Sequence, residues 1–278
     1  MTDSKTFRAS LIQLRSTRTT APNIEAVSTF VAEAANDGAD YIQTPENTAL
    51  MELKSRSLFE NIEPEEDNSA LQAFTRLAKD FSVWLHIGGM AIRLSDKEAA
   101  NRAFLIAPDG TIKARYDKIH MFDVDLPNGE SYRESKNFRP GTKAVLAELP
   151  WGKIGLTICY DLRFPALYRT LAQAGAEILT VPAAFTKPTG EAHWHTLLRT
   201  RAIENGCFVM AAAQGGFHET GRATYGHSVI ISPWGEILAE AGSSPGWISA
   251  DIDLKQVKTI RQKLPSLQHD RDFELEKS

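Results

Sequence analysis

The chain has 278 residues and a mass of 30.7 kDa, and 42% of its residues are hydrophobic, enough for a large core. Its formal net charge is −4 and its pI is about 6.0, with Lys and Arg scattered along the sequence, which excludes an electrostatic site for nucleic acid and favours a small-molecule partner. No apolar run approaches the roughly 20 residues of a membrane span, the polar residues 1–6 do not resemble a secretory signal, and two cysteines favour a reducing, cytoplasmic setting.

Strands and helices are expected to alternate along the chain. The hydrophobic periods predict strands at 7–14, 41–44, 83–91, 103–107, 112–116, 153–158, 178–181, 208–213, 226–231 and 237–240. They predict helices at 23–36, 69–80, 165–174 and 193–204. This alternation is typical of an α/β fold. We expect one domain over residues 1–278, with a polar N-terminus and a C-terminal tail from about residue 255.

Two pairs of segments share a sequence pattern. Residues 38–45 (GADYIQTP) parallel residues 175–182 (GAEILTVP), and residues 105–112 parallel residues 230–237 in the same order. The repetition predicts two related halves, each with a sheet whose outer face is covered by helices. We therefore expect a four-layer α-β-β-α sandwich of two pseudo-symmetric halves, with the sheets packed face to face.

A cysteine follows directly after a predicted strand in residues 155–165. Cys159 ends this strand, and Pro165 begins the next helix. Strand-to-helix turns expose a nucleophile at the end of a sheet and direct backbone N–H groups at the reacting atom. Cys159 is therefore the candidate nucleophile, although free cysteines are commonly inert core residues, which is the interpretation favoured for Cys207. Glu46 also follows a strand, so it is expected at the same edge.

Three segments resemble the signature regions of the nitrilase superfamily of carbon–nitrogen hydrolases. They are residues 44–47 (TPEN), 115–123 (RYDKIHMFD) and 155–165 (GLTICYDLRFP), in the order that the family has them. The resemblance extends over about residues 7–254. It implies the α-β-β-α sandwich, an enzyme without metal or cofactor, and assembly as a homodimer or larger homo-oligomer.

The resemblance implies a Glu-Lys-Cys triad. It assigns the general base to Glu46, the cationic stabiliser to Lys118 and the nucleophile to Cys159. The second glutamate of the family, which supports the lysine and the attacking water, is expected at Glu130 in the segment 128–132.

These residue types suit amide hydrolysis. A free thiol has a pKa of about 8.5, so a base such as Glu46 must accept its proton. The ammonium of Lys118 and the backbone N–H of Tyr160 are expected to stabilise the oxyanion. The expected reaction passes through an acyl thioester on Cys159, which water then hydrolyses.

Several further segments resemble one branch of the superfamily, that of deaminated glutathione amidase and the ω-amidases, and the former pattern is the more similar. They lie in residues 129–132, 159–165, 184–194 and 222–228. The resemblance implies a small carboxylate-bearing amide, such as deaminated glutathione, as substrate. The expected pocket residues are Tyr160, Phe185, Thr189 and Arg222, with Arg222 able to bind a carboxylate.

Other functions stay open from the sequence. The same triad serves ω-amidases, nitrilases and N-carbamoyl amidohydrolases, and a non-catalytic binding or scaffold protein is the alternative of a different class. A Cys–His dyad with His120 is the alternative thiol mechanism. His193 and His195 are two residues apart and do not share a helix face, which disfavours joint metal ligation. Asp161 and Arg163 are interpreted as an ion pair that fixes the turn.

Overall fold

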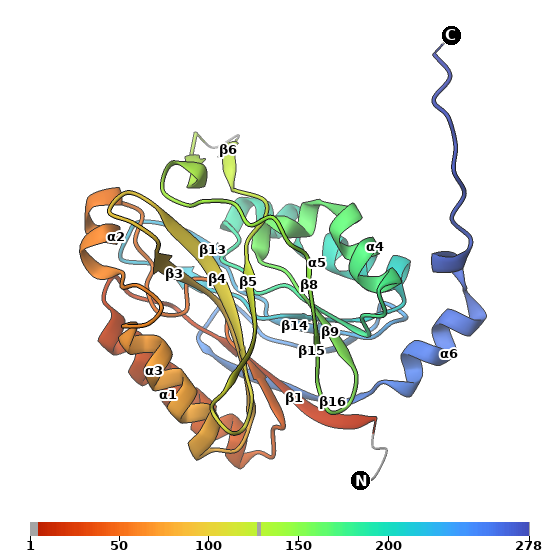
Figure 1. Cartoon of the computed structure of the whole chain (residues 1–278), viewed down its shortest axis with the longest axis horizontal. Coiled ribbons are helices and arrows are strands. Elements are labelled where there is room, and N and C mark those ends of the chain that lie inside the picture. The colour runs from red at the N-terminus through yellow and green to blue at the C-terminus, as the bar shows by residue number, and fades with distance from the viewer. Residues whose placement is uncertain (1–4, 127–128, 278) are drawn as a thin grey trace.

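The structure is a computed structural model that describes residues 5–126 and 129–277. The expected polar N-terminus therefore lies almost wholly outside the described residues. In the described chain, two six-stranded sheets pack face to face and helices cover their outer faces (Figure 1). The predicted α-β-β-α sandwich is thus confirmed.

The first sheet contains strands from the first half of the chain and one from its end. Its order is β16 (Gly246–Asp253), β1 (Thr6–Gln13), β2 (Tyr41–Gln43), β3 (Trp84–Arg93), β4 (Ala99–Ile106) and β5 (Ile112–Asp117). Its outer face is covered by α1 (Thr20–Asn36) and α3 (Ser69–Asp80), and α2 (Ser55–Asn61) lies between them in sequence. The periodic apolar residues of α1 and α3, such as Val27 and Phe74, are buried against this sheet.

The second sheet repeats this arrangement. Its order is β15 (Ile237–Glu240), β14 (Val229–Ile231), β11 (Phe208–Ala211), β10 (Ile178–Thr180), β9 (Lys153–Leu156) and β8 (Val145–Glu148). It is covered by α4 (Pro165–Gln173) and α5 (Lys187–Asn205).

The pairing of the strands confirms the internal repeat. In the first sheet β1, β2 and β3 are parallel, and β16, β4 and β5 are antiparallel to their neighbours. In the second sheet β9, β10 and β11 are parallel, and β8, β14 and β15 are antiparallel. The two repeated sequence patterns coincide with β2 and β10 and with the turns β4–β5 and β14–β15, so the halves have the same topology.

The two halves approach most closely beside the site. A Cβ atom on Gly88 would lie 2.2 Å from the Pro182 side chain and 2.2 Å from the Thr44 carbonyl oxygen. Only glycine fits there, because contacts this short do not occur for real Cβ atoms. Pro45 and Pro182 hold equivalent places in the repeat, so the ends of β2 and β10 meet at this glycine.

The segments that the sequence pattern did not predict are mostly short or polar. They are the edge strands β8 and β16, helix α2, the hairpins β6–β7 (Asp123–Asp125, Ser131–Arg133) and β12–β13 (Gly215–Phe217, Ala223–Tyr225), and helix α6 (Lys255–Lys263). The expected C-terminal tail thus begins with a helix, which Arg261 fastens by donating to the Ala176 carbonyl at 2.6 Å. Among the described residues, no helix has the length and apolar character needed to cross a bilayer.

Candidate active site

Cys159 lies at the junction between β9 and a 3-10 turn, η2 (Cys159–Arg163), with a positive φ of 49°. Its backbone N–H donates to the Pro182 carbonyl at 2.9 Å. Left-handed backbone is uncommon for a residue with a Cβ, and it persists where the surroundings impose it. The side chain was expected to be exposed at the end of the sheet, but it is only 6% exposed, because it lies at the floor of a cavity.

Asp161 holds this turn from below. Its fully buried carboxylate accepts hydrogen bonds from the Ile158 N–H at 2.9 Å, the Tyr116 hydroxyl at 2.7 Å and the His120 N–H at 3.1 Å. Asp161 therefore fixes the turn as expected, but the predicted ion pair with Arg163 is wrong. The guanidinium of Arg163 instead lies 5.4 Å from the ring centre of Phe185.

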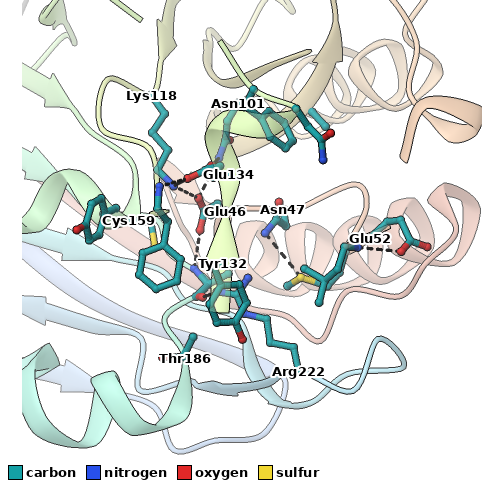
Figure 2. A pocket seen from close by; sticks show the side chains of 18 of the residues that line it. Glu46, Asn47, Glu52, Asn101, Lys118, Tyr132, Glu134, Cys159, Thr186 and Arg222 are labelled. Carbon is teal, nitrogen blue, oxygen red and sulfur yellow. Dashed lines mark hydrogen bonds and ion pairs between the residues drawn. The ribbon is translucent and has the colours of Figure 1, made fainter. Parts of the chain in front are cut away.

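Glu46 reaches the same cavity from the loop after β2. Its Oε1 accepts from Lys118 Nζ at 2.8 Å and from Asn101 Nδ2 at 2.9 Å, and its Oε2 accepts from the Ala184 N–H at 2.9 Å. Gln214 donates to the Glu46 carbonyl at 2.9 Å and holds its backbone. The carboxylate is thus oriented by contacts from both halves of the molecule (Figure 2).

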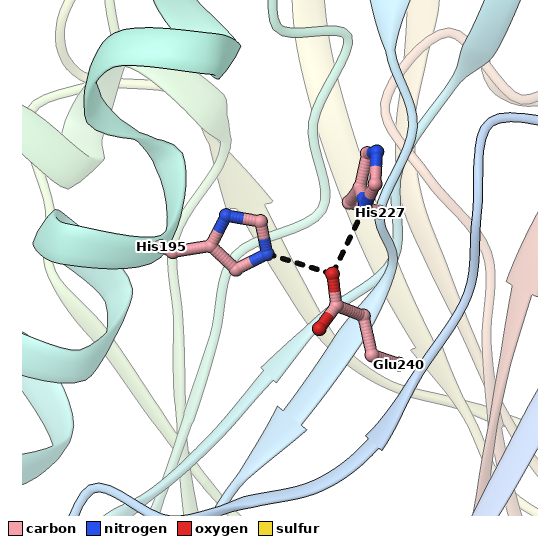
Figure 3. Close-up of side chains that lie close together, drawn as sticks. All are labelled: His195, His227 and Glu240. Atoms are coloured by element: carbon pink, nitrogen blue, oxygen red, sulfur yellow. Dashed lines mark hydrogen bonds and ion pairs between the residues drawn. The ribbon is translucent and has the colours of Figure 1, made fainter.

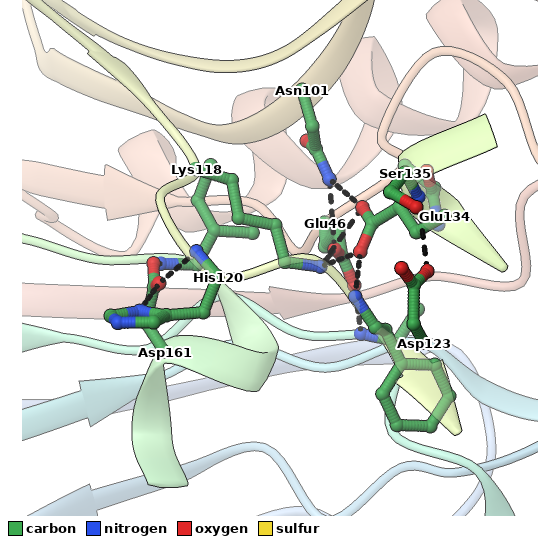
Figure 4. A network of polar contacts seen from close by, with 12 residues as sticks. Glu46, Asn101, Lys118, His120, Asp123, Glu134, Ser135 and Asp161 are labelled. Carbon is green, nitrogen blue, oxygen red and sulfur yellow. Dashed lines mark hydrogen bonds and ion pairs between the residues drawn. The ribbon is translucent and has the colours of Figure 1, made fainter. Parts of the chain in front are cut away.

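Lys118 is buried between two carboxylates. Its Nζ donates to Glu46 and also to both oxygens of Glu134, at 3.0 and 2.8 Å (Figure 4). The expectation for Glu130 is wrong for this contact: its carboxylate accepts from the Tyr132 hydroxyl at 2.8 Å, and Glu134 contacts the lysine instead. The reason is the β6–β7 hairpin, because Glu134 begins the 3-10 turn η1 (Glu134–Lys136) after it and enters the cavity.

Two site residues were missed by the sequence interpretation, Asn101 and Glu134. Asn101 Nδ2 donates to Glu46 and, at 3.2 Å, to Glu134, so it joins the two carboxylates that flank Lys118. Asn101 lies in the middle of β4, where a buried amide among apolar neighbours is a signal of a polar partner. Glu134 had a weaker signal, because Glu130 and Glu134 both follow the lysine motif and lie four residues apart.

Burial and charge shift the pKa values of the three central groups. Burial and the negative charge of Glu46 raise the pKa of the Cys159 thiol, and Lys118 opposes them only in part. Burial works to raise the pKa of Glu46, but Lys118 outweighs it, so the pKa is lowered. Burial works to lower the pKa of Lys118, and Glu134 and Glu46 outweigh it, so the pKa is raised. At neutral pH the site therefore holds a protonated thiol beside an ionised carboxylate and an ammonium.

The expected substrate-binding residues line the same cavity, which has a volume of about 220 Å³. Tyr160, Phe185, Thr189 and Arg222 all border it, together with Cys159. Figure 2 shows Arg222 at the end of the cavity away from Lys118. Thr189 belongs to the first turn of α5, and its hydroxyl lies 2.8 Å from that of Thr186.

The alternative histidine chemistries are not favoured by the geometry. His120 Nδ1 lies 2.7 Å from Asp161, and its ring stacks on Phe164 with centroids 3.5 Å apart. It therefore supports the turn. His193 and His195 have different partners, Arg163 and Glu240, as expected for residues on different helix faces.

The sequence comparison identifies the family. The family model described as carbon–nitrogen hydrolase matches residues 8–262. The chain belongs to the carbon–nitrogen hydrolase family. A deaminated glutathione amidase of Yersinia enterocolitica is 41% identical over 96% of this chain and 94% of its own length, and human omega-amidase NIT2 is 35% identical over 95% of each. The predicted class of enzyme, a carbon–nitrogen hydrolase of the amidase type, is confirmed.

Solved structures of family members agree with the fold. The C. elegans NitFhit protein superimposes with a TM-score of 0.89 and 33% identity, covering 96% of this chain and 66% of that protein. Nit3 of Saccharomyces cerevisiae, a nitrilase-superfamily member, gives a TM-score of 0.82 at 28% identity, covering 94% of each chain. A Nesterenkonia amidase, with a TM-score of 0.80 and 25% identity over 98% of this chain and 95% of its own, carries the acetamide moiety of fluoroacetamide on its active-site cysteine.

Proposed function

We propose that this carbon–nitrogen hydrolase cleaves a small, carboxylate-bearing amide through an acyl thioester on Cys159, with deaminated glutathione as the best candidate substrate. The observation that carries the proposal is the meeting of Glu46, Lys118 and Cys159, which come from distant parts of the chain, in one buried cavity. The relatives named deaminated glutathione amidase support the substrate class.

Glu46 acts first as general base. It is ionised at neutral pH, whereas burial and its own charge keep the Cys159 thiol protonated. The free enzyme therefore stores the proton on sulfur, and the carboxylate accepts it as sulfur attacks the amide carbonyl carbon. This order keeps the buried thiolate, which is costly without a partner, from accumulating before substrate binds.

Lys118 and the turn η2 supply positive charge for the tetrahedral intermediate. The ammonium of Lys118 is held by Glu46 and Glu134, and Tyr160 N–H belongs to the first turn of η2, where an N–H has no acceptor within the helix. These donors stabilise the oxyanion formed when sulfur bonds to carbon. One such donor is typically worth about 10²–10³ in rate.

The intermediate then collapses and the enzyme is regenerated. Glu46 returns the proton to the leaving nitrogen, the C–N bond breaks, and ammonia departs from the acyl thioester. A water that gives its proton to Glu46 attacks the thioester carbon, and the proton moves to Cys159 as the C–S bond breaks. Glu134 orients Lys118, and Asn101 holds the two carboxylates in register.

Arg222 provides the site for a substrate carboxylate. Its Nη2 donates to the Ala184 carbonyl, and its guanidinium lies 5.0 Å from the ring centre of Tyr132. Its Nε is buried without a hydrogen-bond partner among the described residues. A buried, unpaired donor of a charged group is costly, and a bound carboxylate would satisfy it.

Product analysis tests the reaction class. The purified enzyme is incubated with ω-amides, 2-oxo amides, nitriles and N-carbamoyl compounds, and ammonia, acid and carbon dioxide are measured. We expect ammonia and acid from carboxylate-bearing amides. Preferred turnover of a nitrile, or release of carbon dioxide from an N-carbamoyl compound, would favour those alternatives.

The variant C159A tests the nucleophile. We expect turnover to be abolished while the thermal melt stays close to that of the wild type, because one small buried group is replaced by another. C207A is the matched control, since Cys207 is fully buried and contacts Arg261 instead of the cavity. Retained turnover in folded C159A, or an unreactive protein that only binds amides, would contradict the proposal.

We also propose that the enzyme is a homodimer or larger homo-oligomer. Large apolar side chains are exposed at Ile203 and Trp234, which are 52% and 55% exposed, and a Cβ on the neighbouring Gly235 would touch Ile203. Such a patch is typical of an interaction surface. Light scattering of the purified protein gives the subunit number, and a monomeric mass would overturn this proposal.

A cytoplasmic, reducing setting is proposed on the same terms. Both Cys159 and Cys207 are free thiols, and the reaction requires Cys159 to stay reduced. Fractionation of the source cells with an antibody against this chain is the direct measurement, and recovery from an oxidising compartment would contradict the proposal.

A further inference from the structure

Two histidines and a glutamate converge outside the catalytic cavity. His195 projects from α5, His227 lies just before β14, and Glu240 ends β15 (Figure 3). We call them the His-Glu-His cluster. His195 Nε2 and His227 Nδ1 lie 2.8 and 2.9 Å from the same carboxylate oxygen, Glu240 Oε1. None of the three lines the catalytic cavity.

We propose that the His-Glu-His cluster is a binding site for a divalent transition-metal ion, with Zn²⁺ the best match, which fastens α5 to the strands β14 and β15. The three ligand atoms all lie within 4.8 Å of one another. A tetrahedral zinc ion with bonds of about 2.0–2.1 Å places its ligand atoms roughly 3.3 Å apart. A retreat of the Glu240 carboxylate by about half an ångström therefore makes room for the ion.

The ligand set suits zinc and its neighbours. Neutral imidazole nitrogens bind Zn²⁺, Co²⁺, Ni²⁺ and Cu²⁺, whereas Mg²⁺ and Ca²⁺ prefer oxygen ligands alone. The cluster supplies two nitrogens and one carboxylate, which leaves a fourth position for water. The three side chains are 31%, 30% and 31% exposed, so an ion can enter from solvent and keep that water.

His227 is already held in place by its surroundings. Its φ is 56°, its N–H donates to the Gly242 carbonyl at 2.9 Å, and its own carbonyl accepts from Trp194 Nε1 at 2.8 Å. Its ring stacks on Tyr225 with centroids 4.3 Å apart. Contacts of this kind around a ligand orient its ring and lower the cost of ordering it when metal binds.

The bound ion would act on the wall of the catalytic cavity, not on the chemistry. Tyr225 N–H donates to the Phe185 carbonyl at 3.0 Å, and a Cβ on Gly190 would lie 2.3 Å from Tyr225. Tyr225 thus connects His227 with the start of α5, where Phe185 and Thr189 border the cavity. The metal is therefore assigned a structural role, independent of the proposed amide hydrolysis.

Metal titration of the whole enzyme tests the site. Protein freed of metal with a chelator is titrated with Zn²⁺ by calorimetry, and with Co²⁺ by absorption spectroscopy. We expect one saturable site per chain and a Co²⁺ spectrum without the thiolate charge-transfer band that Cys159 or Cys207 would give. Zinc at 100-fold above Kd should raise Tm by about 5 °C or more, with turnover persisting in the chelated enzyme.

Variants separate the metal site from a plain hydrogen-bonded trio. E240Q keeps a carbonyl oxygen for the two rings but loses the anionic ligand, and H195A removes one nitrogen. Loss of an outer partner of a ligand typically costs 10–100-fold in affinity, so each variant should weaken zinc by about 100-fold or more. H193A, on the same helix, is the control and should bind zinc like the wild type. Absence of a saturable wild-type site, or equal affinity in E240Q and H195A, overturns the proposal.

Discussion

Exchange of Glu134 for Gln isolates the contact that the family resemblance assigned to a different glutamate. Both Glu134 oxygens accept two hydrogen bonds: Oε1 from Lys118 at 3.0 Å and Asn101 at 3.2 Å, and Oε2 from Lys118 at 2.8 Å and Phe122 N–H at 2.7 Å. Either orientation of a glutamine amide therefore turns its NH₂ group toward two donors. The variant keeps the shape of the side chain and loses both the charge and half of the acceptors.

The expected cost follows from the burial of the lysine. Removing one partner of a buried ion pair costs about 3–5 kcal/mol. Lys118 keeps Glu46 as a partner and the Glu134 side chain is 14% exposed, which places the loss at the lower end, about 3–4 kcal/mol. At 1.36 kcal/mol per tenfold change, kcat/KM should fall about 10²–10³-fold.

The assay is ammonia release from a dicarboxylic acid monoamide, with wild type, E134Q and E130Q compared at equal folded concentration. E130Q is the matched control, because the Tyr132 hydroxyl that donates to Glu130 can donate equally to a glutamine carbonyl. We expect E130Q to change kcat/KM by no more than about threefold, in line with a substitution outside a buried network. A larger loss in E130Q than in E134Q would refute the assignment of Glu134 to the lysine.

Three further results are expected. R222A should raise KM for a carboxylate-bearing amide at least tenfold more than it lowers kcat, because the guanidinium binds a remote carboxylate, and equal kinetics for an amide without a carboxylate provide the control; unchanged kinetics would remove Arg222 from the site. Burial lowers the pKa of His86 from 6.5 to about 3, so its contribution to stability is complete above pH 6.5 and is lost as the pH falls toward 3, at about 1.4 kcal/mol per pH unit. Urea unfolding at pH 7 and pH 4.5 should thus show a smaller acid loss in H86Q than in wild type, and equal losses would contradict the buried neutral imidazole. A thiol electrophile should label the native enzyme once, at Cys159, with protection by substrate, because Cys207 is fully buried and its pKa is raised to about 11; labelling that persists in C159A would argue against this.

Local sequence determined the secondary structure wherever the pattern was long and apolar. Helix α3 was predicted with the bounds that it has, and the parallel strands that form the centre of each sheet were predicted within a few residues. The edge strand β16 was missed, because its partly exposed residues alternate weakly and its pairing with β1 joins the two ends of the chain. Pairing over such a distance leaves little local signal.

The site divides in the same way. Glu46, Lys118 and Cys159 each sit in a short motif that the residues around them make recognisable, so the sequence sufficed to nominate them. The choice between Glu130 and Glu134 was decided by tertiary structure, because a hairpin and a 3-10 turn set which of two carboxylates four residues apart enters the cavity. The His-Glu-His cluster likewise exists only in the folded chain, since its members come from a helix and two strands. Chemistry-bearing residue types are written in the sequence, whereas their partners depend on the packing of segments that are distant along it.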